Sequence, residues 1–316
     1  MRVRPGRASR PRSRIRPQHA DALSAMVVGV DRGRYSCALD GRSVVAMRAR
    51  ELGRKSVVVG DRVELVGDTS GAPGALARIV RVNPRRSVLR RTADDDDPTE
   101  RVIVANADQL VIVSSLAAPP PSTGFIDRCL VAAYDAGIEP LLCLTKSDLV
   151  SGPPPILDYY ADLDLRHVTT RAELPPETLR EKLTGLVSVL VGHSGVGKST
   201  LVNRLVPGAG RTVGEVRSIG KGRHTSTSVV ALRLPAKGWI VDTPGVRSFG
   251  LAHVSAASLL HGFADLDRGT EHCPTDCDHT TTHGECTLDA WVAAGNTDPR
   301  RLASYRRLLA SRTAQE

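Results

Sequence analysis

Aromatic residues are scarce in this sequence, since three phenylalanines, five tyrosines and two tryptophans account for 3% of its 316 residues. Long apolar runs are also missing, and none approaches the ~18 residues of a membrane-spanning helix. The first shortage argues against a nucleic-acid surface built mainly on stacked rings, and the second predicts a cytoplasmic protein without a membrane span. Hydrophobic residues still make up 41% of the chain, enough for two or three domains with a substantial core.

Cysteines are few, and their placement favours metal binding over a disulfide framework. Three of the six lie in apolar or strand-like surroundings and are expected in the core, namely Cys37, Cys129 and Cys143. The other three cluster with one histidine, as Cys273, Cys277, His279 and Cys286. Three thiolates and one imidazole suit a single structural zinc ion, for which His272 and His283 are nearby substitute ligands.

Acidic residues are absent from the first twenty positions, which carry seven arginines. No apolar segment follows, so this stretch is not a secretory signal, and we expect a disordered basic arm over residues 1–24. The arm contacts RNA phosphates in one interpretation and is a solvated tail in another, with an organellar transit peptide as a third. The net charge of +9 predicts a polyanionic partner, with a merely basic protein as the alternative.

The strongest motif is a glycine-rich segment, residues 192–199, which reads Gly-His-Ser-Gly-Val-Gly-Lys-Ser. It follows the apolar run 186–191 and precedes an expected helix, the setting that a phosphate-binding P-loop requires. Backbone N–H groups of such a loop surround phosphates, Lys198 reaches the outer phosphates, and Ser199 binds Mg²⁺. The predicted contacts are Gly192, His193, Ser194, Gly195, Val196, Gly197, Lys198, Ser199 and Thr200.

A second motif, Asp-Thr-Pro-Gly at residues 242–245, follows the strand-like segment 239–241. A carboxylate at the end of a strand can hold the Mg²⁺ shell, and a glycine N–H can sense the γ-phosphate. Asp242 and Gly245 are therefore predicted to bind the nucleotide, with a plain turn as the alternative interpretation.

A third motif, made of Thr145, Lys146, Ser147 and Asp148, ends the apolar run 140–144. It resembles the guanine-recognition element of GTPases, in which the aspartate accepts hydrogen bonds from base N1 and N2. Adenine lacks that donor pair, so the motif predicts GTP rather than ATP.

The order of these motifs is informative. An ordinary GTPase begins with the P-loop and ends with the guanine element, whereas here the guanine element comes first, so the G domain is circularly permuted. Read in this order, the chain resembles the ribosome small-subunit-dependent GTPase A family from about Met26 to Leu309. The resemblance implies a GTPase that acts in late maturation of the small ribosomal subunit, binds its rRNA, and is released on hydrolysis. It also implies a second base-contacting loop at Thr169 and Thr170, where this sequence departs from the family's usual Ser-Ala pair, so a role without base contact is the alternative. We expect the protein to be a monomer.

Two other functions stay open. A permuted GTPase could act on another RNA assembly, and a nucleotide-gated RNA-binding scaffold would hydrolyse little GTP. The scaffold is suggested by Val246, which stands where many GTPases place a water-orienting glutamine. An adenylate-using P-loop enzyme is the remaining alternative.

The segment 214–228 combines glycines, basic residues and hydroxyls without apolar periodicity, as a nucleotide-ordered loop would. The resemblance implies that Thr225 binds Mg²⁺ and the γ-phosphate, with Thr227 as a substitute. His224 is our candidate for orienting water, with a structural or RNA-contacting role as the alternative. Together with Lys198 these form the expected catalytic set, slow unless the small subunit stimulates it.

The fold class implied by the resemblance is a multidomain α/β protein with a barrel, a permuted G domain and a zinc-binding helical lobe. The expected divisions are a basic arm at 1–24, an OB-fold barrel at 25–88, a linker at 89–104, a GTPase domain at 105–254 and a zinc-binding helical domain at 255–316. An SH3-like barrel is the structural alternative. In the zinc cluster one ligand pair is shifted by a residue from the family's usual spacing, which leaves the role of Cys277 open.

Turn signals separate the short segments from which the barrel is expected to form. These predicted strands are Met26–Val30, Tyr35–Leu39, Ser43–Met47, Val57–Val59, Arg62–Val66 and Ala77–Val82. The segment offers one ring, Tyr35, but many arginines, which favours recognition of the RNA backbone over base readout. Four consecutive acids, 94–97, are expected to form a solvated loop.

Apolar residues recur at helical spacing near the C-terminus and predict a helix from about 298 to 310. Several arginines on this segment are expected to face outward, where they could meet rRNA or simply be solvated. They are Arg300, Arg301, Arg306, Arg307 and Arg312.

Overall fold

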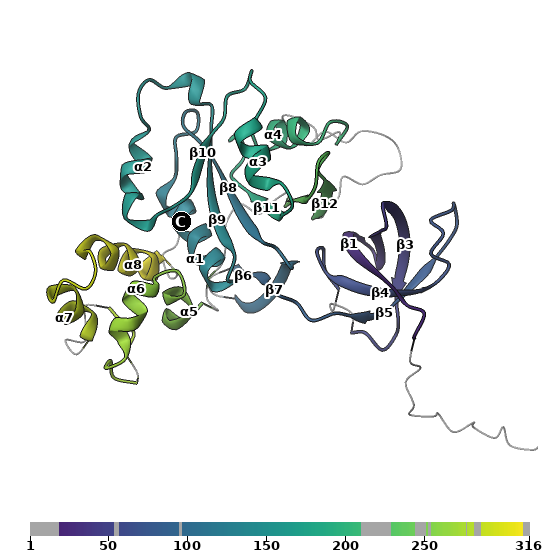
Figure 1. The fold of residues 1–316 in the computed structure, drawn as a ribbon, viewed down its shortest axis with the longest axis horizontal. Coiled ribbons are helices and arrows are strands. Elements are labelled where there is room, and N and C mark those ends of the chain that lie inside the picture. Colours follow the sequence, from purple (N-terminus) through teal and green to yellow (C-terminus); the bar gives the residue numbers. More distant parts are fainter. Residues whose placement is uncertain are drawn as a thin grey trace, which may run out of the picture.

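The computed structural model describes residues 19–53, 57–94, 97–209, 229–243, 251, 254–275, 277–280 and 286–311, with only the backbone of 91–94 and 97–100. Figure 1 shows three regions, with a barrel of β-strands at one end, an α/β region in the middle and a cluster of helices at the other end. This arrangement confirms the predicted fold class.

The barrel closes through five strands. They are β1 (Leu23–Asp31), β2 (Arg34–Leu39), β3 (Arg42–Arg48), β4 (Arg62–Gly67) and β5 (Ala77–Val82). Their order is β1-β2-β3-β5-β4, β4 pairs back onto β1, and β3 and β5 run parallel. This five-stranded closure is that of an OB-fold. The strand predicted over 57–59 was wrong, because only Val59 forms an isolated bridge, to Val104.

A β-hairpin occupies the segment expected as a linker. It consists of β6 (Val88–Asp94) and β7 (Asp97–Ala105), and the first and last acids of the acidic run, Asp94 and Asp97, pair with each other. Leu89 and Val104 are buried in the main core, which explains why this segment is ordered against the α/β region. Asn106 donates a hydrogen bond to the carbonyl of Gly60, 3.0 Å away, and so ties the barrel to the hairpin.

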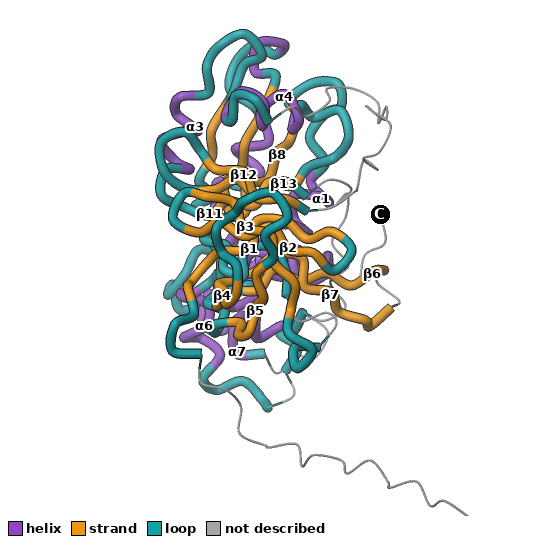
Figure 2. The backbone as a smooth tube through the Cα atoms, turned by 90° about the vertical axis from the view of Figure 1, so that its right-hand side faces the viewer, coloured by secondary structure: helices purple, strands orange, loops and turns teal. Residues whose placement is uncertain are grey.

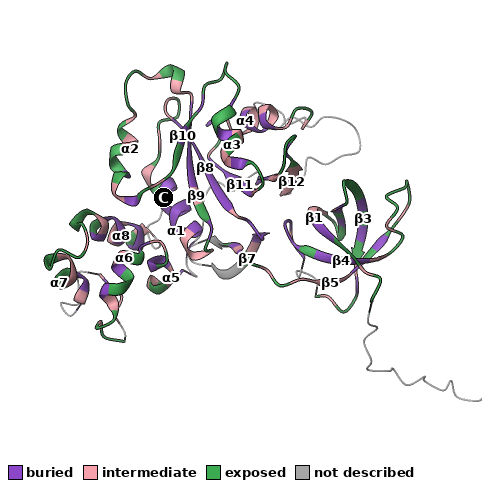
Figure 3. Cartoon of the chain, in the orientation of Figure 1, coloured by how far each residue is buried: buried purple, intermediate pink, exposed green. Residues whose placement is uncertain are grey.

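The central sheet continues from the barrel in the order β12-β13-β11-β8-β9-β10, and only β12 is antiparallel to its neighbour. The strands are β8 (Gln109–Ser115), β9 (Glu139–Thr145), β10 (His167–Thr169), β11 (Val187–Val191), β12 (Val230–Arg233) and β13 (Trp239–Asp242). Every residue of β8 and β11 is buried, as Figure 3 shows, because helices cover both faces of a parallel sheet.

Helices from different parts of the chain cover the two faces. They are α1 (Thr123–Asp135), α2 (Pro155–Tyr159), α3 (Glu177–Leu183) and α4 (Lys198–Leu205), with short 3₁₀ turns η1 (Ser147–Leu149) and η2 (Ala161–Leu163). Leu110 and Ile112 of β8 share a core with α1. Val111 and Val113, on the opposite side of the same strand, pack with α3 and α4.

The C-terminal lobe contains α5 (Ala256–Leu260), α6 (Ala264–Asp267), the 3₁₀ turn η3 (Arg268–Thr270), α7 (Thr287–Ala293) and α8 (Pro299–Ser311). Phe263 and Tyr305 join its core to α1, and their ring centroids are 5.4 Å apart. Cys37, Cys129 and Cys143 are buried, as predicted. None of the described helices combines the length and apolar character needed to cross a membrane.

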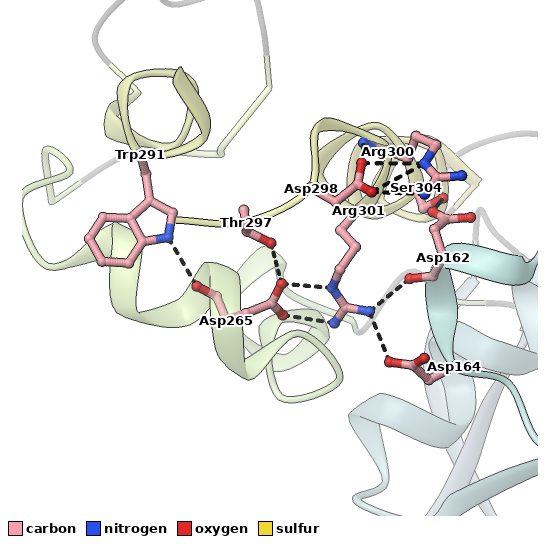
Figure 4. A network of polar contacts seen from close by, with 9 residues as sticks. All are labelled: Asp162, Asp164, Asp265, Trp291, Thr297, Asp298, Arg300, Arg301 and Ser304. Carbon is pink, nitrogen blue, oxygen red and sulfur yellow. Dashed lines mark hydrogen bonds and ion pairs between the residues drawn. The ribbon is translucent and has the colours of Figure 1, made fainter. Parts of the chain in front are cut away.

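The expectation that the arginines of α8 face outward was wrong for three of them. Arg301 donates to both carboxylate oxygens of Asp265 at 2.7 Å and to the backbone carbonyl of Asp162 at 2.8 Å (Figure 4). Burial alone would raise the pKa of Asp265, but hydrogen bonds from Arg301 and Thr297 lower it to about 2. Arg301 therefore ties α8 both to α6 and to the α/β region.

The next two arginines are also paired. Arg306 donates to both oxygens of Asp289 on α7, at 2.8 and 2.7 Å. Arg307 lies 3.3 Å from the buried carboxylate of Asp127 on α1, and its guanidinium carbon is 4.5 Å from the ring centre of Tyr159. By contrast, Arg300 is 73% exposed. Arg312 lies outside the described residues.

Candidate functional site

The predicted nucleotide motifs follow three parallel strands of the central sheet and lie at the same edge of it. The P-loop follows β11, the guanine element begins at the end of β9, and Asp242 ends β13. In open α/β sheets, ligands bind outside the carboxyl ends of the strands. Segments far apart in sequence therefore meet where a nucleotide can contact all of them.

The P-loop has the backbone conformation that its glycines permit. Gly195 and Gly197 have φ values of +82° and +93°, a region that other residues rarely adopt. A Cβ at Gly192 would lie 2.6 Å from the carbonyl oxygen of Val113, so this position has no room for a side chain. The loop leads directly into α4, whose first residue is Lys198. The N-terminus of α4 is thus presented to the space beside the loop, where it favours an anion.

The two charged groups expected at the phosphates and at Mg²⁺ touch each other. The Lys198 ammonium donates to a carboxylate oxygen of Asp242, and the two side chains are only 13% and 7% exposed. The next residue, Thr243, donates to the carbonyl of Leu190, 2.8 Å away, and so attaches the end of β13 to β11. The pair keeps both charges neutralised at the position where phosphates and a cation would separate them.

The guanine element is hydrogen-bonded to the P-loop. The Thr145 hydroxyl donates to the carbonyl of Val196 at 2.5 Å, and the Lys146 ammonium donates to the carbonyl of Ala118. Lys146 has a φ of +57°, so the chain turns sharply as it leaves β9. These contacts hold the guanine element at a fixed position relative to residues 192–199.

A small cavity of about 110 Å³ lies between the guanine element and α4. Thr145, Lys146 and Gly197 line it on one side, and Thr170 lines it from the segment after β10. The Thr170 carbonyl accepts a hydrogen bond from the N–H of Ser147 at 3.2 Å. Of the two threonines proposed for the second base-contacting loop, the structure therefore brings Thr170 to the cavity.

Sequence reasoning missed Arg204, which also lines this cavity. It sits near the end of α4 and donates to the carbonyls of Arg171 and Leu174, at 3.0 and 2.8 Å. The helix that begins at Lys198 thus also holds the loop that follows β10. An arginine in the last turn of a helix is common, so its sequence position alone carries no such signal.

His193 of the P-loop contacts α1 through its side chain. Its ring centroid lies 4.1 Å from that of Phe125 on α1. This packing directs the imidazole towards α1 and anchors the loop.

The predicted metal ligands are brought together by the C-terminal lobe. The ligand atoms of Cys273, Cys277, His279 and Cys286 all lie within 4.8 Å of one another. Burial raises the pKa of Cys286 to about 11 and lowers that of His279, which keeps the imidazole neutral with a free lone pair. The four side chains could hold a metal ion, and Cys277 belongs to the group despite its shifted spacing.

Some predicted residues cannot be placed. His224, Thr225, Thr227, Gly245 and Val246 lie outside the described residues.

Known proteins were compared with the chain in sequence and in structure. Residues 82–252, more than half of the chain, match the family described as RsgA GTPase. A Pseudomonas aeruginosa protein called small ribosomal subunit biogenesis GTPase RsgA is 40% identical over 265 residues, 81% of this chain and 76% of the relative. The Chlorobaculum parvum protein of the same name is 38% identical over 85% of this chain and 90% of its own.

Two solved structures share the fold. YjeQ from Thermotoga maritima superposes with a TM-score of 0.67 at 25% identity, covering 93% of this chain and all of the other. YloQ, described as a circularly permuted GTPase, superposes with a TM-score of 0.65 at 19% identity over 94% of this chain and 98% of its own. The second likeness bears on the fold alone.

Motif order, strand topology and site geometry together define a circularly permuted GTPase. The extent and identity of the matches allow a narrower assignment. The chain belongs to the RsgA GTPase family and is a GTP hydrolase.

Proposed function

We propose that this protein is a GTPase that acts in late maturation of the small ribosomal subunit, which it leaves when GTP is hydrolysed. The observation that carries the proposal is the permuted set of nucleotide motifs at one sheet edge, in a chain 40% identical to a relative named for small-subunit biogenesis. A positively charged barrel and a net charge of +9 support an rRNA partner.

The roles at the nucleotide follow from where the side chains lie. The P-loop N–H groups and the N-terminus of α4 would surround the phosphates, and Lys198 would leave Asp242 to meet them. Ser199 and Asp242 would hold Mg²⁺, which neutralises charge developing on the phosphates. Asp148 would accept from the guanine base, with Thr145 and Lys146 holding that segment in place.

We keep the remaining site residues as proposals. His224 would orient the attacking water, Thr225 would complete the Mg²⁺ shell, and Gly245 would sense the γ-phosphate. The divisions at 24, 88, 104 and 254 likewise stay proposals for the domain boundaries, as does the monomeric state.

The metal at the C-terminal cluster is proposed to be zinc. Three sulfur ligands and one imidazole nitrogen match the donors and coordination number of a structural zinc site. Cys273, Cys277, His279 and Cys286 would hold it, and all four belong to the protein, so no open position is left for substrate. The ion would stabilise the lobe that α8 attaches to the α/β region.

The direct test is steady-state GTP hydrolysis with and without purified small ribosomal subunits, using large subunits as the control. Ordering a GTPase site by a partner can raise the rate by about 10³ to 10⁵. We expect strong stimulation by small subunits alone. Equal rates with either subunit would contradict the proposal, whereas hydrolysis that stays negligible with GTP-dependent RNA binding intact would favour the scaffold.

A further inference from the structure

A cleft of about 480 Å³ lies where the barrel meets the β12–β13 hairpin, away from the nucleotide motifs. Figure 2, viewed from the barrel side, shows this hairpin beside the barrel strands, and β12 pairs with β1 through Val230 and Gly29. The volume of the cleft falls within the ~300–1,000 Å³ that is typical of small-molecule sites. One unpaired nucleotide is of suitable size for such a cleft.

The inner wall of the cleft is apolar. Met26 alternates with Ala25 and Val27, which fill the barrel, so its side chain packs instead into the main core under the cleft. Val28 lines the same wall, and the half-buried Trp239 on β13 contributes an indole ring. This ring gives the cleft a flat aromatic surface, which the barrel itself lacks.

The rim of the cleft is basic. Arg42 and Arg62 come from the barrel, Arg233 and Lys237 from the hairpin, and all four are exposed. Within the described part of the chain, none of these four side chains forms an ion pair. Asp40 is the single acidic residue of the lining. Unpaired cations facing one cavity from two sides create a strong local attraction for an anion.

The hairpin wall of the cleft is anchored to the α/β region and reaches the barrel at two points, the Gly29–Val230 pair and Arg233. Gly238, in the hairpin turn, has a φ of +102°, and a Cβ there would lie 2.7 Å from the carbonyl oxygen of Leu186. The N–H of Gly185 donates to the Lys237 carbonyl at 3.0 Å. On the barrel side, a Cβ at Gly41 would lie 3.8 Å from an Arg233 guanidinium nitrogen, so this arginine reaches across to the β2–β3 turn. The cleft is therefore built into the junction.

We propose that this cleft binds one unpaired nucleotide of a single-stranded RNA, with its base against Trp239 and the flanking phosphates on the basic rim. Arg233 and Trp239 are directly opposite each other on β12 and β13, so both side chains project from the same face of the hairpin. A base on the indole thus has a guanidinium beside its phosphate. Stacking on a ring combined with basic side chains along the backbone is how proteins hold single strands without sequence readout.

The proposal rests on the proposed rRNA partner, but its test uses no ribosome. The probe is a fluorescein-labelled oligouridylate of about 12 nucleotides, followed by anisotropy, with an RNA duplex of equal length beside it. We expect Arg42→Glu/Arg233→Glu to lower affinity for the single strand by roughly tenfold or more. The slope of log K against log salt should fall by about 1.4, since each lost phosphate contact removes ~0.7.

The matched control is Arg78→Glu/Arg81→Glu, which makes the same charge change at exposed residues of β5 outside the cleft. It should change affinity by less than about twofold at moderate salt. Basal GTP hydrolysis should be unchanged in both double variants, which reports that the G domain is folded. An equal loss of RNA affinity in the control would show that general attraction, not the cleft, binds the strand.

Tryptophan fluorescence independently tests whether a base stacks on Trp239. The single strand should quench the wild-type protein, and Trp239→Phe should remove most of the quenching while the other tryptophan, Trp291, is retained. Undiminished quenching in Trp239→Phe, or a duplex that binds as tightly as the single strand, would overturn the proposal. Unchanged RNA affinity in the cleft variant, with lost binding of a polyglutamate peptide, would assign the cleft to an acidic protein instead.

These outcomes are separable from those of the proposed function. If the wild-type protein binds oligouridylate at the cleft but small subunits do not stimulate its GTP hydrolysis, the cleft proposal is supported and the ribosomal role is contradicted. Stimulation by small subunits with no effect of the cleft variant on RNA binding would do the reverse.

Discussion

The arginines of α8 and the cations of the barrel–hairpin cleft look alike in sequence but differ in what surrounds them. Arg301, with 19% of its side chain exposed, meets a carboxylate in two hydrogen bonds, whereas Arg233 is exposed and has no ion pair within the described residues. Paired arginines satisfy the protein's own acids, and their charge is not available to a polyanion. Of the basic residues behind the net charge of +9, those without a nearby acid are therefore the ones that can bind a polyanion.

The same contrast exists within the barrel. Arg85 donates to both oxygens of Asp61, a residue with a fully buried side chain, at 2.7 and 2.9 Å. Arg62, on the neighbouring β4, lines the cleft. Basic residues of one domain thus divide into those that hold the fold and those that are free to bind.

Loss of the proposed metal ion should have the largest effect on stability, because the whole lobe that carries the paired arginines would depend on it. Zinc binding is typically worth ~10–16 kcal/mol in small zinc modules. We expect Cys277→Ser to lose the ion and to unfold the lobe, seen as loss of bound zinc by mass spectrometry and a lower melting temperature. His272→Ala, an exposed neighbour outside the cluster, should keep both. A variant that stays folded without metal would show that the ion pairs suffice.

Arg301→Ala should have the next largest effect on stability. It leaves Asp265 without its bidentate partner and breaks the bond to the Asp162 carbonyl, so the free energy of unfolding should fall by about 2 kcal/mol in urea titrations. RNA binding by the folded protein should not change. A loss of RNA affinity at full stability would mean that this arginine belongs with the binding cations.

Arg204→Ala tests an arginine whose partners are backbone carbonyls at the nucleotide site. Freeing the loop at Arg171 and Leu174 should raise KM for GTP about tenfold, equivalent to ~1.4 kcal/mol, with little change in kcat. Arg204→Lys can still donate to one carbonyl and should recover part of the affinity. If KM is unaffected, the cavity beside this loop does not receive the base.

Arg300→Ala should have the smallest effect, and it is the matched control for Arg301. Its pair with Asp298 joins two exposed side chains on the same turn, and solvent screens such pairs so that they add little to stability. The urea midpoint of unfolding should stay close to that of the wild-type protein and well above that of Arg301→Ala. A loss as large as that of Arg301→Ala would remove the distinction between buried and exposed pairs.

Local features of the sequence predicted much of the fold and the candidate site. The glycine pattern of the P-loop indicates its conformation, because Gly195 and Gly197 have positive φ values and Gly192 has no room for a side chain. The apolar run before each motif marks a buried strand. The shared sheet edge then follows from the parallel topology. The four metal ligands are close in sequence, and the lobe indeed brings them together.

Features that depend on long-range contacts could not be predicted in this way. Arg301 meets Asp265 and Asp162, which are 36 and 139 positions away, so helical periodicity could not reveal that it is buried. The segment 89–104 was expected to be a linker because its many polar residues obscure three buried positions, Leu89, Ile103 and Val104. The cleft could not be predicted, because Arg62 and Trp239 line one cavity only when the hairpin joins the barrel.

The proposed function requires that the protein binds GTP and the small ribosomal subunit together and leaves the subunit after hydrolysis. The most direct measurement is co-sedimentation of the full chain with small subunits, in the presence of a non-hydrolysable GTP analogue or of GDP. We expect the chain to sediment with small subunits in the presence of the GTP analogue and to be largely released in the presence of GDP. It should not sediment with large subunits in the presence of either nucleotide. Equal binding in both nucleotides, or binding to neither subunit, would contradict it.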